Sequence, residues 1–470
     1  MPKVVIIGGG ISGLTTAWWL HKAGCDVLVL EKDSQVGGTM QTIHDNGWLV
    51  ETGPNSALET TPLFQTLFDD LGLQDEVVYA NEVSNKRYIV RNGELHALPM
   101  TPGQFLKSRL WSLAGKFRLF KEPFIGRSEQ EETVAQFVIR RLGQEILDYA
   151  INPFVAGVFA GNPEELSVQA AFPKLYALEK KYGSLIKGQV FGARERKRRA
   201  EKAKDRARMF SFQEGMNTLP RRIAQALHGR IKTSLTVTNI TTQRSSNGAR
   251  SPYEIHYTEH GQPMSITAHA VILAIPSFQS ATLMKPYNAS VAEFLSTIYY
   301  PPVAQVFLGY RREDAARPLD GFGFLVPAKE RRDILGMIWS STIFPGRSPA
   351  GTVACTTFVG GSRQPELVDK TDVELLDIVR REVAELIQLK GTPLYSRVTR
   401  WAKAIPQYRL GHLSVVKELE QFEQSSPGLY LSGNFRGGIS VGDCIKSSRE
   451  IADKVLKFLE TPDLVLSHVG

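Results

Sequence analysis

The sequence predicts a fold of mixed α/β and α+β class, and three of its features carry the prediction. Near the N-terminus, the apolar run Val4–Ile7 is typical of a buried parallel strand, and Ile11–Lys22 has apolar residues at helical spacing. The dipeptide Asn92-Gly93 separates two short alternating runs, which indicates a hairpin with a type I′ turn. Residues 103–190 have a mostly helical pattern. The length of 470 residues suggests roughly three domains.

The N-terminal strand and helix are joined by a GxGxxG turn made of Gly8, Gly10 and Gly13. The first glycine permits the tight turn, the second lets the backbone approach a pyrophosphate, and the third lets the helix pack on the strand. Glu31 follows 18 residues after Gly13, where a carboxylate can accept hydrogen bonds from ribose hydroxyls. These residues predict a Rossmann-type dinucleotide-binding domain.

Two further glycine pairs distinguish between the dinucleotides. Gly37-Gly38 follows Glu31 at short range and favours FAD, since a second glycine pair lets the chain run close to the phosphates of an extended cofactor. Near the C-terminus, a strand at Leu429–Leu431 is followed by Gly437-Gly438 and a helix. A helix N-terminus suits the partial negative charge on the N1/O2 edge of a flavin. Glycine turns near both ends of the chain therefore predict FAD.

Further elements follow from apolar periodicity, with Gly and Pro marking their ends. We expect helices over residues 62–71, 217–227, 371–389 and 442–459, and strands over residues 27–30, 231–240, 253–257, 270–275, 302–310, 321–327, 352–359 and 429–431.

Composition excludes several classes of protein. The three cysteines Cys25, Cys355 and Cys444 are far apart and form no CxxC pair, which argues against a zinc site and a disulfide framework and favours a reducing compartment. No apolar stretch reaches the ~18 residues of a spanning helix. No cleavable signal is evident, because the apolar start runs straight into the glycines.

The net charge of +8 is concentrated in one segment, since residues 194–208 carry nine basic and three acidic side chains. The rest of the chain carries only +2, which excludes a generally basic surface. The segment is either a solvated loop or a site of attachment to anionic lipid. Nucleic acid is disfavoured because no aromatic residues lie between the charges.

The sequence resembles the flavin-dependent protoporphyrinogen oxidases, within the broader group of amine-oxidase-like flavoproteins, over nearly the whole chain. The glycine motifs are shared by the whole group, whereas other segments are more specific. These segments are Lys86–Ile89 ahead of Arg91–Gly93, Asn152–Asn162 with Leu166-Ser167, Gly321–Pro327, Phe358–Ser362, Ile405–Tyr408 and Gly437–Gly442. The basic segment 194–208 is less typical of the family, so its role does not carry over.

The resemblance implies a set of residues for each ligand. Non-covalent FAD would be lined by Gly8, Gly10, Ile11, Ser12, Gly13, Glu31, Lys32, Gly37, Gly38, Thr39, Gly53, Pro54, Asn55, Ser56, Val237, Trp401, Gly433, Gly438, Ile439, Ser440 and Val441. Arg87 would hold a porphyrinogen propionate, Leu325 and Ile338 would sandwich a pyrrole ring, and Phe358 would stack on the opposite side. From spacing alone, Arg87 would be a solvated hairpin charge and the other three plain core residues.

The resemblance also implies the domain plan and the reaction. An FAD-binding domain would comprise residues 1–83, 209–285 and 400–470, a β-rich substrate domain residues 286–399, and a mostly helical, membrane-facing insert residues 84–208. Protoporphyrinogen IX would be oxidised to protoporphyrin IX in haem or chlorophyll synthesis, with O2 reduced to H2O2. The expected setting is cytoplasmic and peripheral on the membrane, with an anionic lipid surface, ferrochelatase or a second copy of the chain as candidate partners, and no nucleic acid.

We expect the flavin to carry the chemistry, with no catalytic side chain and no metal. His96 and His412 are therefore expected to be surface or packed residues. Coproporphyrinogen III is the nearest alternative substrate, and its four propionates should require more basic groups than Arg87 alone. An amine oxidase with covalent flavin is disfavoured because Cys444 is followed by Ile445 and not by tyrosine. A non-enzymatic, membrane-binding protein with a structural FAD is a further alternative.

Overall fold

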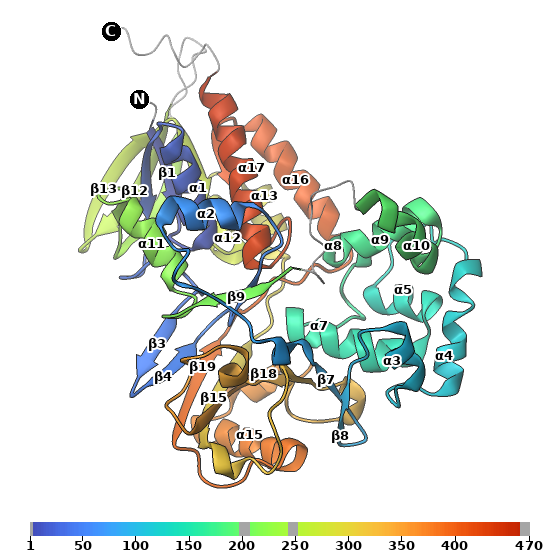
Figure 1. Ribbon diagram of the computed structural model, residues 1–470. Helices are drawn as coiled ribbons and strands as arrows, with labels where there is room; N and C mark the ends of the chain where they lie inside the picture. Colours follow the sequence, from blue (N-terminus) through green and yellow to red (C-terminus); the bar gives the residue numbers. More distant parts are fainter. Residues whose placement is uncertain (1–2, 197–206, 243–251, 461–470) are drawn as a thin grey trace, which may run out of the picture.

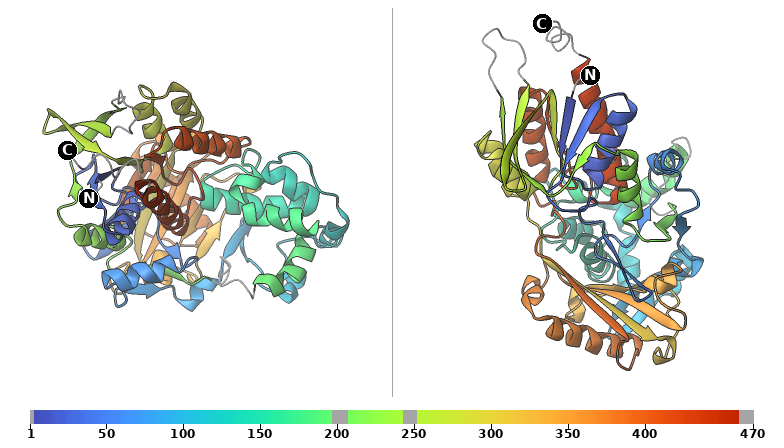
Figure 2. Two further views of the ribbon diagram at one scale, coloured as in Figure 1. Left: turned by 90° about the horizontal axis from the view of Figure 1, so that it is seen from above. Right: turned by 90° about the vertical axis from the view of Figure 1, so that its left-hand side faces the viewer.

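The computed structural model describes residues 3–196, 207–242 and 252–460, and it contains two sheet-based units with a helical region beside them. Figure 1 shows a five-stranded sheet near both termini, a seven-stranded sheet below it, and the helical region on one side. The two sheet-based units lie one above the other in the right-hand view of Figure 2. The expected mixed class of fold is confirmed.

The five-stranded sheet is entirely parallel and has the order β10-β2-β1-β14-β20. Its strands are β1 (Lys3–Ile7), β2 (Asp26–Leu30), β10 (Ile231–Lys232), β14 (Ala270–Leu273) and β20 (Leu429–Leu431). Strands from both ends of the chain therefore meet in one sheet. β1 lies in the middle, so the glycine turn that follows it opens at the carboxyl edge, where ligands bind in such sheets.

Each face of this sheet is covered by a separate apolar layer. One layer contains α1 (Ile11–Lys22), α2 (Leu63–Leu71), α11 (Thr218–Ala226) and α17 (Val441–Leu459). The other contains the antiparallel strands β11 (Leu235–Thr242), β12 (Tyr253–Glu259) and β13 (Gln262–Ala268), with α12 (Ser277–Met284), α13 (Ala289–Ser296) and α16 (His412–Ser425). Burial on both faces explains why the β1 sequence is continuously apolar.

The seven-stranded sheet has the order β19-β15-β18-β17-β16-β7-β8. Its strands are β7 (Tyr88–Arg91), β8 (Glu94–Ala97), β15 (Val303–Arg311), β16 (Gly323–Leu325), β17 (Gly336–Ile338), β18 (Thr352–Gly360) and β19 (Tyr395–Trp401). The long helix α15 (Asp372–Ile387) packs on one face of this sheet, and the apolar core between them includes Trp339 and Tyr310. On the other face, Phe307 and Ala354 pack against Trp48 and Val50.

The predicted hairpin is confirmed, and it belongs to this sheet. Asn92 and Gly93 have φ values of 55° and 75°, as a type I′ turn requires, and β7 pairs with β16. The strands β7 and β8 lie inside the range 84–208 that we expected to be a mostly helical insert. The helical part of this range begins only at α3.

The helical region consists of short helices with their own apolar core. They are α3 (Pro102–Lys107), α4 (Leu113–Leu119), η2 (Glu122–Phe124), α5 (Val134–Arg141), α6 (Gln144–Ile146), η3 (Leu147–Ile151), α7 (Asn152–Phe159), α8 (Val168–Ala171), α9 (Pro173–Tyr182) and α10 (Leu185–Arg196). Arg141 is fully buried and pairs with Glu122 and Glu179. Such a buried charge is tolerated only because both carboxylates surround it.

The remaining elements are small. They are the pair β3 (Thr42–Asp45) and β4 (Trp48–Glu51), the sheet of β5 (Ala57–Leu58), β9 (Met209–Phe212) and β6 (Val77–Tyr79), the helix α14 (Ser340–Ile343), and the 3-10 turns η1 (Glu82–Asn85), η4 (Arg312–Asp314), η5 (Ala328–Glu330) and η6 (Pro365–Asp369). Of the basic segment, residues 197–206 lie outside the described residues.

One predicted strand is wrong as a single element. Residues 231–240 contain all of β10 and most of β11, which belong to different sheets. The break lies at Ser234, whose φ is 59° and whose N–H donates to the Asp33 carbonyl at 3.0 Å. A residue in the left-handed region turns the chain from one sheet into the next.

Candidate functional site

The glycine turn between β1 and α1 lies at the carboxyl edge of the parallel sheet. A Cβ at Gly13 would lie 2.0 Å from the Gly8 carbonyl oxygen, and a Cβ at Gly8 would lie 2.6 Å from the Ala274 oxygen. Both glycines are therefore required by packing. Gly10 differs, since a Cβ there would meet nothing within 4 Å and its φ of −73° suits any residue.

The loop after β2 closes over this turn. Gly37 forms a bridge with Gly10, and its N–H donates to the Gly9 carbonyl at 2.8 Å. The buried Glu31 carboxylate accepts hydrogen bonds from the N–H groups of Gly9 at 2.5 Å and Asp33 at 2.8 Å. Glu31, which is predicted to bind the ribose, is therefore held beside the glycine turn that is predicted to bind the phosphates. Lys32, Gly38 and Thr39 are exposed on the same loop.

Residues 52–56 connect the nucleotide-binding turn to the seven-stranded sheet. A Cβ at Gly53 would lie 2.0 Å from the Thr39 carbonyl oxygen, so this segment passes directly against the loop after β2. The Trp401 Nε1–H donates to the Thr52 carbonyl at 2.6 Å. Gln305 of β15 donates from its side chain to the Glu51 carbonyl. The strands β15 and β19 therefore hold the predicted FAD segment Gly53–Ser56 against their sheet.

The C-terminal glycine turn lies between β20 and α17. Gly437 and Gly438 have φ values of 82° and 126°, and a Cβ at Gly438 would lie 2.5 Å from Cγ of Asp443. Ser440 caps α17 in a reciprocal capping box with Asp443. The helix therefore begins with a fixed N-terminus beside the end of β20, as the sequence predicts.

Val237 is the one predicted FAD residue on the small antiparallel sheet. It lies on β11 where the register with β12 shifts between Val237 and Asn239. Such a bulge frees backbone groups from the ladder. Val237 itself pairs with Tyr257 and is half-buried, and the residue left outside the ladder is Thr238.

Three of the four predicted substrate residues share one face of the seven-stranded sheet. Leu325 pairs with Gly336, which pairs with Phe358, so their side chains emerge on the same face. Ile338 lies two residues beyond Gly336 and therefore points the same way. Leu325 reaches α7, where a Cβ added to Gly157 would lie 2.5 Å from it. Each of the three apolar residues is half-buried.

Arg87, the fourth predicted substrate residue, precedes β7 at the rim of this face. Its side chain is exposed, and its guanidinium carbon lies 5.5 Å from the centroid of the Phe322 ring. The surrounding protein atoms nevertheless lower the pKa of Arg87 by desolvation. An exposed cation with many atoms around it lies in a hollow, and Arg87 stays charged there and open to an anion.

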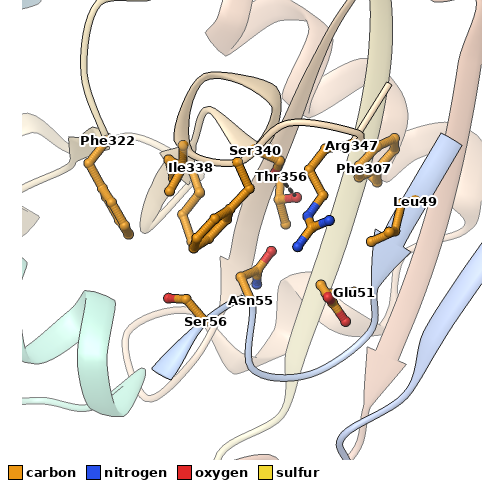
Figure 3. Close-up of a pocket in the computed structure, with 12 residues that line it drawn as sticks. Leu49, Glu51, Asn55, Ser56, Phe307, Phe322, Ile338, Ser340, Arg347 and Thr356 are labelled. Atoms are coloured by element: carbon orange, nitrogen blue, oxygen red, sulfur yellow. Dashed lines mark hydrogen bonds between the residues drawn. The ribbon is translucent and has the colours of Figure 1, made fainter. Parts of the chain in front are cut away.

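A small cavity of about 10 Å³ lies between the predicted FAD segment and the predicted substrate face. Figure 3 shows Ile338 and Phe322 on one side of it, Asn55 and Ser56 below, and the facing side chains of Arg347 and Glu51. Residues predicted to contact the two ligands thus line a common space, which has room for about one water molecule.

Sequence reasoning missed the buried pair Glu51 and Arg347. Burial raises the pKa of Glu51 to about 7, although Oε2 accepts a hydrogen bond from Thr42 and Oε1 one from the Met216 N–H. Burial also lowers the pKa of Arg347, whose guanidinium donates to Ser211 at 2.8 Å. The only sequence signal was an acidic residue shortly before Gly53.

Comparisons with known proteins agree with this site. Residues 11–456 match the family described as flavin containing amine oxidoreductase. Protoporphyrinogen oxidase 2, chloroplastic/mitochondrial, of Arabidopsis thaliana is 34% identical, with 98% of this chain and 94% of the relative covered. The chain belongs to the flavin-containing amine oxidoreductase family.

Further relatives support the same assignment. Coproporphyrinogen III oxidase of Bacillus subtilis is 28% identical over 97% of this chain and 98% of its own length. A crystal structure from Exiguobacterium sp. 255-15 has a TM-score of 0.80 at 23% identity, covering 98% and 99% of the two chains. Cyclohexylamine oxidase from Brevibacterium oxydans has a TM-score of 0.69 at 16% identity, covering 98% and 100%. These two structures show the shared fold.

FAD is the cofactor of this flavin-containing amine oxidoreductase, and the geometry of its glycine turn fits the group. Neither the packing nor the backbone conformation at Gly10 requires glycine. A residue without a side chain beside a helix N-terminus leaves room for a pyrophosphate. Binding of the flavin cofactor therefore explains why position 10 is a glycine, which contacts within the protein do not explain.

His412 is a packed residue, as expected. It is 6% exposed at the start of α16, and its ring stacks on Tyr408 with centroids 4.2 Å apart. Burial lowers its pKa to about 4 from an ordinary value of 6.5. His96, on β8, is half-buried.

The buried His412 predicts a measurable acid sensitivity. Between pH 6.5 and pH 4 the unfolded chain binds a proton at this residue and the native protein does not, so stability falls as the pH falls. Lowering the pH from 7.5 to 5 should remove about 2 kcal/mol of unfolding free energy through His412. Urea unfolding at both values should show that His412→Phe is less acid-sensitive than the unaltered protein. Equal acid sensitivity would contradict the assigned pKa.

Proposed function

We propose that this protein oxidises protoporphyrinogen IX to protoporphyrin IX, with O2 as the electron acceptor. The substrate loses six electrons and six protons, and three O2 molecules are reduced to three H2O2. The observation that carries the proposal is the half-buried apolar face of Leu325, Ile338 and Phe358 with the exposed Arg87 at its rim. A flexible, apolar macrocycle with acidic propionate side chains matches a surface of this composition.

The comparisons support the same substrate class. The Arabidopsis relative that is named a protoporphyrinogen oxidase matches 98% of the chain at 34% identity. The Bacillus relative that is named a coproporphyrinogen III oxidase matches at 28%. The difference favours protoporphyrinogen and keeps coproporphyrinogen as the alternative to be tested.

Each part of the proposed site would contribute to orientation and not to proton transfer by a dedicated side chain. When bound, FAD supplies hydride acceptance at its N5 atom. Arg87 would hold a propionate through its planar fork of N–H groups. Ile338, Leu325 and Phe358 would place a pyrrole unit and exclude water. The segment Gly53–Ser56 would keep the cofactor and this face adjacent, because Gln305 and Trp401 donate hydrogen bonds to the two carbonyls directly before it.

We propose the domain roles on the same basis. The five-stranded unit would bind FAD and the seven-stranded sheet would bind the porphyrinogen, with the predicted boundaries near residues 83, 208, 285 and 399. Cys444 is buried within α17, which supports non-covalent attachment of the flavin. Ferrochelatase and a second copy of the chain stay candidate partners.

A comparison of two substrates tests the proposal. The purified protein should be supplied with protoporphyrinogen IX and, separately, with coproporphyrinogen III, and porphyrin fluorescence and H2O2 should be followed. We expect a higher kcat/KM for protoporphyrinogen. A higher kcat/KM for coproporphyrinogen would replace the proposed substrate, and oxidation of amines without porphyrinogen oxidation would exclude both.

The helical region has a surface suited to lipid, and we propose that it contacts a membrane. Leu113, Phe117, Phe120 and Phe124 are 72%, 67%, 67% and 87% exposed. Leu113 and Phe117 lie one turn apart on α4, the Phe120 ring follows with its centroid 6.1 Å from that of Phe117, and Phe124 ends η2. Exposed aromatic stripes of this kind are typical of peripheral attachment. No helix in the described ranges has the length and hydrophobicity to cross a bilayer.

Removing two of these rings should weaken vesicle binding. We expect Phe117→Ser with Phe120→Ser to lower the partition coefficient on anionic vesicles at least about tenfold, because each buried ring contributes about 1.5–3 kcal/mol. Cosedimentation measures the effect. The matched control is Val373→Ser with Leu394→Ser, which removes side chains that are 67% and 48% exposed elsewhere. Equal loss in both double variants would point to a different contact surface.

A further inference from the structure

The turn before α17 is held by a buried stacked pair that sequence analysis did not assign. Tyr408 is 4% exposed and His412 is 6% exposed, and their rings lie 4.2 Å apart with an interplanar angle of 13°. The Tyr408 hydroxyl contacts the backbone of residues 434–438. This segment leads from β20 into the N-terminus of α17.

Two hydrogen bonds connect the pair to this segment. The Tyr408 hydroxyl donates to the Asn434 carbonyl at 2.6 Å and accepts from the Gly438 N–H at 3.1 Å. The buried His412 ring stacks on the Tyr408 ring and limits the positions that the hydroxyl can take. The pair thus holds both ends of the segment.

Contacts with the helical region anchor the pair. The Tyr408 carbonyl accepts from the Ser167 N–H at 2.8 Å, and the Gly411 N–H donates to the Glu131 carboxylate at 3.0 Å. Glu131 also accepts from the Ser167 hydroxyl at 2.5 Å. Tyr408 therefore cannot move without breaking contacts to the helical region. A rigid support is what a fixed hydrogen-bond donor requires.

We propose that Tyr408 and His412 are positioning residues for the flavin, acting by fixing the backbone of residues 434–438. This inference rests on the proposed function, in which the five-stranded unit binds FAD, with the flavin N1/O2 edge at this turn as the sequence predicts. Gly437 and Gly438 have positive φ values and can adopt many conformations when unrestrained. The hydrogen bonds select one of them. The N–H groups and the dipole of α17 are thereby aimed at the ring edge that becomes negative on reduction.

A phenylalanine at position 408 would preserve the stack and remove only the hydroxyl. We expect Tyr408→Phe to raise the Kd for FAD at least about fivefold and to move the flavin midpoint potential to a more negative value, because the reduced form loses fixed dipoles. His412→Ala, which removes the ring stacked on Tyr408, should shift both quantities in the same direction. Fluorescence titration of the apoprotein and a dye-coupled reductive titration of the holoprotein measure them.

The matched control is Tyr253→Phe. Tyr253 is also 4% exposed, and its hydroxyl donates to the Pro427 carbonyl at 2.9 Å. Pro427 precedes β20, whereas the turn follows this strand. It should leave the Kd and the potential unchanged. Unchanged values in Tyr408→Phe and His412→Ala would overturn the proposal, as would an equal shift in all three variants. If Tyr408→Phe does not fold, His412→Ala decides. Neither readout requires porphyrinogen, so failure of the proposed activity would be seen separately.

Discussion

Gly10→Val should give a folded protein that no longer retains FAD. A Cβ at position 10 meets nothing within 4 Å, and the backbone there suits a β-branched residue. The added side chain would instead occupy the space in front of the helix N-terminus. Losing two charge-assisted phosphate bonds of about 1.5–3 kcal/mol each should weaken FAD binding at least about 100-fold. Flavin absorbance after gel filtration measures the retention of FAD, and a circular dichroism spectrum measures folding.

Two other glycines make this experiment specific. Gly13→Val should disturb the fold itself, because its Cβ would lie 2.0 Å from the Gly8 carbonyl oxygen. Gly126→Val, in the helical region, also has open space around the new Cβ and should change neither property. FAD retained by Gly10→Val at the level of Gly126→Val would mean that the phosphates do not pass this glycine.

Arg87→Ala should strongly impair the use of porphyrinogen while leaving FAD bound. The guanidinium lies in a hollow at the rim of the proposed substrate face and its charge is open to an anion. A charge-assisted pair with a propionate is worth about 1.5–3 kcal/mol, so kcat/KM should fall about tenfold or more. The loss should lie mainly in KM if the arginine holds the substrate equally in the ground state and the transition state.

The neighbouring Lys86 provides the control for charge. Its ammonium pairs with Asp320 at 2.7 Å, so it is already engaged with a carboxylate of the protein. Lys86→Ala removes the same charge one residue away and should change kcat/KM little. Equal effects of the two substitutions would indicate a general electrostatic contribution and not a propionate held by Arg87.

The parts of the fold that were predicted correctly depend on local chemistry. Gly13, the Asn92-Gly93 turn and the start of α17 each have their cause within a few residues. The break at Ser234 was missed because nothing but tertiary pairing distinguishes residues 231–232 from the strand that follows. The short strands β17 and β19 were missed for the same reason, since each depends on neighbours distant in sequence.

In the site too, some residues could be predicted from local sequence and others depend on the fold. Gly10 and Glu31 were found from spacing, whereas the shared face of Leu325, Ile338 and Phe358 requires the sheet register. Their assignment as substrate residues came from resemblance and stays a prediction.

Three contacts were not predictable from the sequence. Gln305 meets the Glu51 carbonyl across 254 positions, Trp401 meets the Thr52 carbonyl across 349, and the Tyr408 hydroxyl bonds to the turn before α17. No local pattern marks such pairs.

The central claim is that a flavin bound between the two ends of the chain takes hydrogen from a porphyrinogen on the adjacent sheet. An anaerobic titration of the purified protein with protoporphyrinogen IX tests it most directly. We expect the visible flavin band to bleach as porphyrin fluorescence rises, and to return when air is admitted. A protein that stays colourless when FAD is supplied, or whose flavin band is unchanged by the porphyrinogen, would contradict it.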